Sequence, residues 1–222
     1  MESDTDNRTK LLRHIKEEVV NFKESPLYKE RVRNKVFPVI GEGSHNARIM
    51  FIGEAPGATE AKTGRPFAGA AGRVLDELLL SVGIRREDVY VTNVVKDRPP
   101  MNRDPLPKEI ALYAPFLDRQ IEIIQPSVIV LLGRHSAKCI MEKFGLESEL
   151  KSISHIHGRV FEASTSYGRI SIIPMYHPAA ALYTPSMLQA LRDDFSRLPA
   201  LLGRESPPLR RASAVPVEET AV

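Results

Sequence analysis

The stretch RIMFIGEAPG, from Arg48 to Gly57, decides the fold. It begins with a short apolar run that stops at Gly53, which predicts a strand over Arg48–Ile52. Three more runs of this kind follow: Val89–Val95 (VYVTNVV), Ser127–Leu132 (SVIVLL) and Ile170–Met175 (ISIIPM). The nearly pure apolar run SVIVLL is typical of a parallel strand that is covered on both faces. The sequence therefore predicts a buried parallel sheet.

Segments with apolar residues at helical spacing alternate with these strands. The expected helices are Arg8–Lys23, Ala71–Val82, Pro107–Ile124, Arg134–Phe144 and Pro185–Leu202. Pro115 lies inside the third of them and should kink or divide it. Strands separated by helices predict an α/β fold, in which a central four-stranded parallel sheet is the middle layer of a three-layer α/β/α sandwich.

The length of 222 residues suits one domain with a sizeable core. We expect this domain over residues 8–202 and a flexible, proline-rich tail over residues 203–222. There is neither an apolar signal segment nor a run of about 18 apolar residues, so we expect a cytoplasmic protein with no membrane partner. We also expect a monomer. The net charge of +3 permits a polyanionic partner but does not require one.

Polar or glycine-bearing segments follow the predicted strands. In strand order, these segments are Gly53-Glu54-Ala55-Pro56-Gly57, Asn93, Gly133-Arg134-His135 and His177-Pro178. Ligands of such sheets bind beyond the carboxyl ends of the strands. The pattern therefore predicts a site at this edge of the sheet, but it does not indicate the chemistry.

Three blocks of the sequence carry a family resemblance. They are GEAPGATEAKTGRPFAGAAGRVLDELL (Gly53–Leu79), VYVTNVVKDRPPMNRDPLPKEI (Val89–Ile110) and IIPMYHPAAAL (Ile172–Leu182). In this order they resemble the first signature, the second conserved block and the closing HP motif of the family 4 uracil-DNA glycosylases. The resemblance implies an enzyme of base excision repair whose partner is uracil-containing DNA. Such an enzyme flips uracil out of DNA, hydrolyses its N-glycosidic bond and leaves an abasic site.

The resemblance implies a role for five side chains. Phe67 should stack on the uracil ring, and Asn93 should read the uracil edge because its amide offers both a donor and an acceptor. His177 should donate to uracil O2 while negative charge builds up on the departing base. Glu54 should handle the attacking water, and Glu60 should lie near uracil C5, where it obstructs the methyl group of thymine.

The resemblance also implies positions where the backbone comes close to the uracil or where the protein contacts DNA. Gly53 should border the uracil site, and Ala55 stands where another uracil-DNA glycosylase family has a water-activating aspartate. Leu182 should enter the duplex where the base leaves. The glycines that should let the backbone come close to base and phosphates are Gly57, Gly64, Gly69 and Gly72. A basic cluster could bind phosphates, although acidic residues interrupt it; its members are Arg85, Arg86, Lys96, Arg98 and Arg103.

The chain departs from the family at the cofactor. Family 4 enzymes hold an iron–sulfur cluster on four cysteines, but the corresponding positions here are Phe22, Ser25, Asp97 and Tyr113. Cys139, the single cysteine, is at none of them. Thiolates are the usual ligands of such clusters, so we expect no cluster, no metal and no organic cofactor. Packing by Phe22 and Tyr113 would then replace the cluster.

Two other functions remain open at this point. One is a non-cleaving relative that binds uracil or DNA, against which the intact Glu54, Asn93 and His177 argue. The other is an enzyme that acts on free nucleotides, which the same fold would permit. The sequence leaves open whether single- or double-stranded DNA is preferred and whether hypoxanthine or xanthine is also removed. It also leaves open how Glu54 and Glu60 divide their roles.

Overall fold

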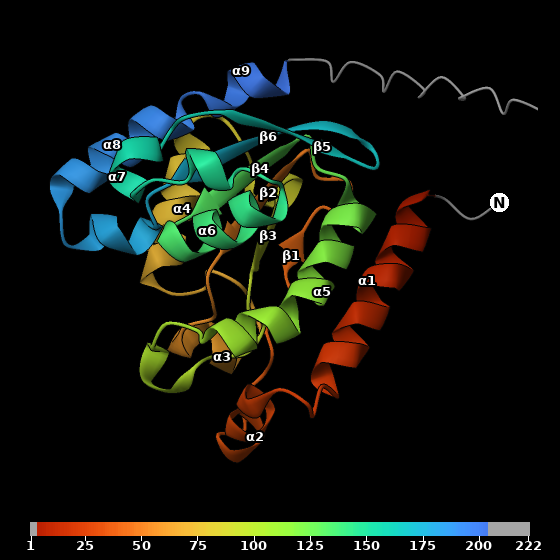
Figure 1. Ribbon diagram of the computed structural model, residues 1–222. Coiled ribbons are helices and arrows are strands. Elements are labelled where there is room, and N and C mark those ends of the chain that lie inside the picture. The colour runs from red at the N-terminus through yellow and green to blue at the C-terminus, as the bar shows by residue number, and fades with distance from the viewer. Residues whose placement is uncertain (1–3, 204–222) are drawn as a thin grey trace, which may run out of the picture.

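The computed structural model describes residues 4–203 and centres on one six-stranded sheet, with the strand order β1-β3-β2-β4-β6-β5 (Figure 1). Its four inner strands are β3 (Tyr90–Asn93), β2 (Ile49–Gly53), β4 (Val128–Leu132) and β6 (Gly168–Met175). These strands are mutually parallel, and each corresponds to one of the four predicted runs. The predicted parallel sheet is therefore confirmed.

Two antiparallel edge strands correct the predicted number of four. β1 (Glu42–Gly43) pairs with β3, and β5 (Phe161–Thr165) pairs with β6. β1 has only two residues, and β5 alternates between buried and exposed positions, because one of its faces meets solvent. Neither strand therefore has the continuous apolar run that identified the inner ones.

Helices cover both faces of the sheet (Figure 1). One face carries α1 (Asp4–Val20), α5 (Pro107–Ile124) and α6 (Arg134–Lys143), and the other carries α4 (Ala70–Ser81), α8 (Pro185–Phe195) and α9 (Leu198–Leu202). Successive side chains of a strand point to opposite faces, so Ile52 of β2 enters the first core and Phe51 enters the second. The three-layer α/β/α prediction is confirmed.

One expected helix runs undivided through a proline, and another is divided in the structure. α5 is not divided at Pro115, because its buried face, which includes Tyr113, Leu117 and Ile121, packs against the core along the whole helix. The helix expected over residues 185–202 is instead two helices, α8 and α9. Pro199 lies in the first turn of α9, where its missing N–H is tolerated, whereas a continuous helix would need that donor.

Shorter elements lie in the connections. The α-helices among them are α2 (Pro26–Arg33), α3 (Ala58–Thr63) and α7 (Ile153–Ile156). The 3-10 helices are η1 (Arg86–Asp88), η2 (Pro100–Asn102), η3 (Glu147–Glu149) and η4 (Pro178–Leu182). No helix within residues 4–203 is long and apolar enough to cross a membrane. The expected tail lies, from residue 204 onward, outside the described residues.

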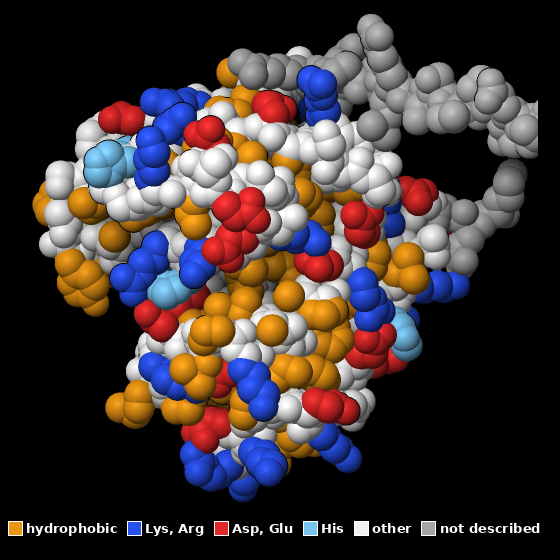
Figure 2. Space-filling view, viewed as in Figure 1, with side chains coloured by type: hydrophobic (Ala, Val, Ile, Leu, Met, Phe, Trp, Pro, Cys, Tyr) orange, Lys and Arg blue, Asp and Glu red, His pale blue; other side chains and the backbone are white. Residues whose placement is uncertain are grey.

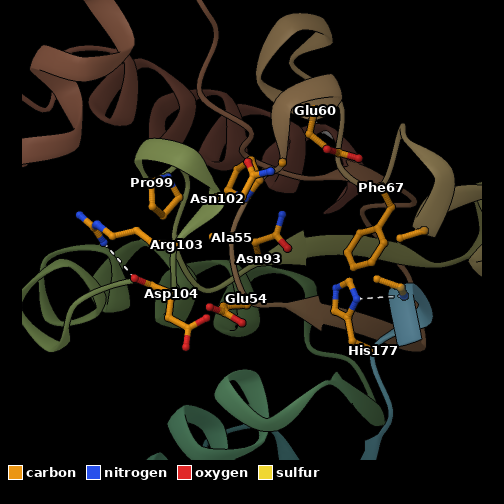
Figure 3. Close-up of a pocket in the computed structure, with 14 residues that line it drawn as sticks. Glu54, Ala55, Glu60, Phe67, Asn93, Pro99, Asn102, Arg103, Asp104 and His177 are labelled. Carbon is orange, nitrogen blue, oxygen red and sulfur yellow. Dashed lines mark hydrogen bonds between the residues drawn. The ribbon is translucent and has the colours of Figure 1, made fainter. Parts of the chain in front are cut away.

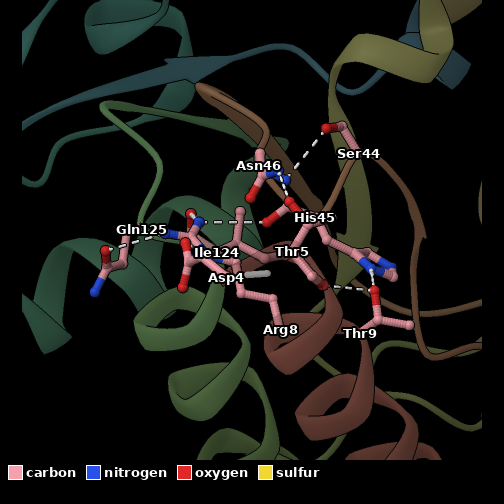
Figure 4. Close-up of polar contacts among 9 residues, drawn as sticks. All are labelled: Asp4, Thr5, Arg8, Thr9, Ser44, His45, Asn46, Ile124 and Gln125. Carbon is pink, nitrogen blue, oxygen red and sulfur yellow. Dashed lines mark hydrogen bonds and ion pairs between the residues drawn. The ribbon is translucent and has the colours of Figure 1, made fainter. Parts of the chain in front are cut away.

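Polar contacts join α1 to the rest of the domain (Figure 4). Arg8 donates to the backbone carbonyl of Ile124, the last residue of α5, at 2.8 Å, and it pairs with Asp4 at 2.9 Å. The hydroxyl of Thr9 lies 2.7 Å from Nδ1 of His45, in the loop before β2. Helix α1 is thus fixed to the end of α5 and to the loop before β2.

Candidate active site

A pocket of about 360 Å³ opens at the carboxyl ends of the parallel strands (Figure 3). It brings together seven of the predicted site residues: Glu54, Ala55, Gly57, Glu60, Phe67, Asn93 and His177. The rest of its lining comprises Pro56, Ala71, Pro99, Asn102, Arg103, Asp104 and Ala179. The position predicted from the strand ends is therefore the position of the pocket.

Asn93 lines this pocket, and Gly53 lies directly behind it. They are the last residues of β3 and β2, and the parallel register places them directly opposite each other. A Cβ atom at Gly53 would meet Asn93 Oδ1 at 2.4 Å and Cζ of Phe67 at 2.8 Å. Position 53 therefore has to be glycine for the amide and the aromatic ring to lie where they do.

Phe67 is held in a strained conformation. Its φ of +50° lies in the left-handed region, which is uncommon for an aromatic residue, and its side chain is buried. Gly72 of α4 lies against its carbonyl group, since a Cβ there would be 1.7 Å from the Phe67 oxygen. The Phe67 ring stacks on the imidazole of His177, with centroids 5.6 Å apart. Packing on both sides thus maintains the strained backbone.

His177 is set up as a neutral hydrogen-bond donor. Its Nδ1 accepts the backbone N–H of Ala179 at 3.2 Å, which places the proton of a neutral ring on Nε2. The second ring nitrogen points toward the centre of the pocket (Figure 3). Burial lowers the pKa of His177 to about 4, although the charge of Glu60 opposes this shift. The side chain can therefore donate into the pocket without carrying a charge.

Glu60 lies between two glycine-bearing segments. Its Oε1 accepts the backbone N–H of Gly69 at 2.8 Å, and a Cβ at Gly57 would come within 2.7 Å of Oε2. Two of the glycines assigned to DNA contact therefore make room for this carboxylate, just as Gly72 makes room for Phe67. Their contact with DNA stays a prediction.

Glu54 belongs to a charged cluster at the mouth of the pocket. Its Oε2 lies 4.0 Å from Nε2 of His135, which is 3.0 Å from Oδ2 of Asp104, and Arg134 pairs with the same oxygen at 2.9 Å. Burial raises the pKa of Glu54, and Asp104 adds to the shift, whereas His135 and Arg134 oppose it. Within residues 4–203, Glu54, Asp104 and His135 are the group with a spacing suited to a metal ion. Here they are joined by ion pairs that also include Arg134.

Several predicted DNA contacts lie outside the pocket. Arg98 donates to Oδ1 of Asn102 at 2.7 Å and lines a neighbouring hollow, while Leu182 is exposed at the end of η4. The assignment of Lys96 to a phosphate-binding cluster is wrong, because this side chain is fully buried. Its ammonium group donates to the Thr92 hydroxyl, the Asn93 carbonyl and Oε1 of Gln120.

The loop between β3 and α5 forms a wall of the pocket, of which the sequence indicated only Arg103, as part of the basic cluster. Pro99, Asn102, Arg103 and Asp104 line it. Glu109 of α5 holds its end, because the carboxylate accepts two hydrogen bonds from Arg103, at 2.8 and 2.6 Å, and one from the backbone N–H of Leu106 at 2.8 Å. The sequence could have indicated this wall, because the loop directly follows a strand that ends at the site.

The four positions at which the resemblance implies cluster ligands meet in the core. The ring of Phe22 packs edge-on against Tyr113 at 5.6 Å. The Tyr113 hydroxyl oxygen lies 2.6 Å from Oδ2 of Asp97 and 2.9 Å from Oγ of Ser25. Arg31 pairs with Oδ1 of Asp97 at 3.2 Å and donates to the carbonyls that end α1. We call Ser25, Arg31, Asp97 and Tyr113 the buried polar network.

This arrangement does not fit an iron–sulfur cluster. None of the four positions offers a thiolate, and the Asp97 carboxylate is already bound by Arg31 and Tyr113. The rings of Phe22 and Tyr113 pack against each other at these positions, and their replacement of a cluster stays a prediction. The network, in which Arg31 pairs with Asp97 at one end, was not predicted from the sequence.

Comparison with known proteins identifies the class. The family model of the uracil DNA glycosylase superfamily matches residues 40–198. Type-4 uracil-DNA glycosylases from Sulfurisphaera tokodaii and Archaeoglobus fulgidus are 46% and 43% identical, over 84% and 88% of this chain and 83% and 95% of their own lengths. The enzyme from Saccharolobus solfataricus is 46% identical over 72% of this chain and 74% of its own. The fold is thus that of the superfamily. Within it, the chain belongs to the type-4 uracil-DNA glycosylases.

The first prediction concerns Gly53. The Gly53→Ala variant should stay folded but lose at least about tenfold in kcat/KM, because the added methyl displaces Asn93 and Phe67 and small misplacements at a site are costly. Excision kinetics and circular dichroism would measure the two effects. Gly203→Ala, where a Cβ would meet nothing closer than 3.8 Å, is the matched control. Unchanged kinetics for Gly53→Ala would contradict the packing described.

The second prediction concerns pH. An unfolded histidine titrates near ~6.5, whereas the pKa of folded His177 is about 4, so this group favours the folded state above pH ~6.5 and its contribution is lost as pH falls toward 4. An NMR titration should show a neutral His177, protonated on Nε2, down to about pH 4. A midpoint above pH 6 would show that the ring is not buried as described.

Proposed function

We propose that this type-4 uracil-DNA glycosylase hydrolyses the N-glycosidic bond of extruded deoxyuridine, releasing uracil and leaving an abasic site without cutting the strand. The observation that carries the proposal is the convergence of Asn93, Phe67 and His177 on one pocket, with a ring nitrogen of His177 pointing into it. The family provides the reaction class, base excision repair of uracil-containing DNA.

Recognition begins with extrusion of the base, which costs about a few kcal/mol because stacking and pairing are lost. Stacking on Phe67 returns about 1–3 kcal/mol of this cost. The Asn93 amide then pairs with one acceptor and one donor of uracil. Cytosine presents the reversed pattern, which would leave a buried amide unpaired, so it is rejected strongly.

Cleavage separates charge between the base and the sugar. Uracil leaves as an anion, and His177 Nε2–H donates to O2 to stabilise it. The sugar becomes cationic, and the partly buried Glu54 carboxylate favours this charge and orients water toward the anomeric carbon. A raised pKa makes Glu54 a better base for the proton that this water releases. Ala55 supplies no group for that step.

Glu60 provides discrimination against thymine. Its carboxylate is fixed by the backbone N–H of Gly69 and lines the pocket near Phe67. A methyl group at C5 would have to displace this hydrogen-bonded group. Glu60 therefore acts on the choice of base, and Glu54 acts on water.

The enzyme works without an iron–sulfur cluster, another metal or an organic cofactor. The support is the buried polar network, which provides side chains unsuited to a cluster and uses the Asp97 carboxylate internally. We infer that the enzyme acts as a monomer. With DNA as its substrate, the enzyme acts in the cytoplasm.

The third prediction tests the reaction. An oligonucleotide with one uracil should break only after alkali treatment, and His177→Ala and Asn93→Ala should each lower kcat by about 10²–10³, the usual loss when such a donor is removed. Gel analysis of labelled strands would measure this. The free deoxyuridine nucleotide should be a poor substrate. Tight binding without strand breakage would favour a non-cleaving relative. Efficient turnover of the free nucleotide would favour an enzyme that acts on free nucleotides.

The fourth prediction tests the cofactor. Protein purified without oxygen should contain no stoichiometric iron or sulfide, and excision should persist after chelation, because the residues at the ligand positions bind one another instead. Elemental analysis and the visible absorption spectrum would measure this. One cluster per chain in cleanly purified protein would refute it.

A further inference from the structure

The tip of the loop between β3 and α5 exposes an apolar side chain. Met101 has 92% of its surface accessible, more than any other large hydrophobic residue in the described part of the chain. Met101 and Asn102 also have φ values of +56° and +54°, so two consecutive residues other than glycine adopt the left-handed conformation. Such strain persists only where the surroundings enforce it, and it clusters at functional positions.

Contacts at both ends hold this loop. Asp97, at its start, is bound by Arg31 and Tyr113, and Arg103, near its end, forms two hydrogen bonds with Glu109. Glu109 and Tyr113 are both buried and lie four residues apart, on one face of α5. A single helix therefore fixes both ends of the loop, and Met101 is presented on a rigid support.

The position of Met101 relates it to the pocket. Its neighbour Asn102 lines the pocket, so the Cα of Met101 lies about 3.8 Å from that of a wall residue. The segment after β6 reaches the pocket through Ala179 and then exposes Leu182 (42%) and Tyr183 (87%). Two exposed apolar tips therefore extend from two separate pocket-lining segments.

The charges near the pocket favour apolar contacts with DNA over binding by a broad basic surface. On the face shown in Figure 2, basic and acidic side chains are interspersed. At the pocket, Arg103 is paired with Glu109 and Arg134 with Asp104. Cations that are already paired add little to phosphate binding, so apolar contacts with the bases gain importance.

We propose that Met101 inserts into the base stack of duplex DNA beside the extruded uracil, as a second wedge in addition to Leu182. The inference rests on the proposed function. Apolar side chains such as methionine and leucine separate base steps when a protein opens or bends a duplex. Two prolines precede Met101, so the backbone before the tip is stiff. A single exposed apolar side chain on a stiff support can enter the gap between two bases.

The fifth prediction tests this wedge. Met101→Ala should lower kcat/KM for a U·G duplex about tenfold, the loss expected when burial of a large apolar side chain is removed, with a smaller loss on the same strand without its complement. Met101→Leu should restore most of the activity. Leu80→Ala, which truncates a 79% exposed side chain on α4, is the matched control and should match the unaltered enzyme.

A fluorescent readout separates insertion from other effects. With 2-aminopurine next to uracil in the duplex, binding should raise the fluorescence as this base unstacks, and Met101→Ala should reduce the rise. Unchanged duplex kinetics together with an unchanged rise would overturn the proposal, as would equal losses on single- and double-stranded DNA. An unaltered enzyme that cleaves neither substrate would refute the proposed function instead, and the fluorescence would still report on the wedge.

Discussion

The register between β2 and β3 is the constraint on which the site depends. Parallel pairing sets Gly53 opposite Asn93 at the end of both strands. A shift of one residue would turn Asn93 to the other face of the sheet and would place a side chain where Gly53 admits Phe67. Alternate side chains of β2 are buried in the two cores on opposite faces of the sheet, and this packing enforces the register. The stability of the core and the geometry of the pocket therefore have one cause.

Around this point, the site keeps its polar groups in fixed and different electrical states. Desolvation lowers the pKa of the partly exposed His177 and keeps it neutral, and the N–H of Ala179 sets its tautomer. Glu54 is more accessible and lies within a set of opposing charges. A neutral hydrogen-bond donor beside the uracil and a carboxylate beside the sugar suit a reaction that separates charge. Neither group has to reorganise during the reaction.

The central architecture and half of the pocket lining could be predicted from the sequence, for identifiable reasons. Inner strands have continuous apolar runs, and the segments after their carboxyl ends must meet, which placed Glu54, Asn93 and His177 together. The edge strands escaped prediction because one face of β5 is solvated and β1 has two residues. Arg31 and Glu109 escaped because a charged residue on a helix usually indicates a solvated face, and only tertiary structure reveals that both are buried.

In the cluster-free enzyme that we propose, the buried polar network also changes what the enzyme depends on in the cell. A protein whose loop is held by an iron–sulfur cluster can mature only where iron and sulfide are supplied, and oxidants attack the cluster. Here Tyr113 and Arg31 hold Asp97 with groups that the ribosome itself supplies. The remaining sensitivity is to protons, since burial raises the pKa of Asp97 although its hydrogen-bond partners oppose the shift. Repair of uracil would then continue under iron starvation or oxidative stress, conditions in which DNA damage accumulates.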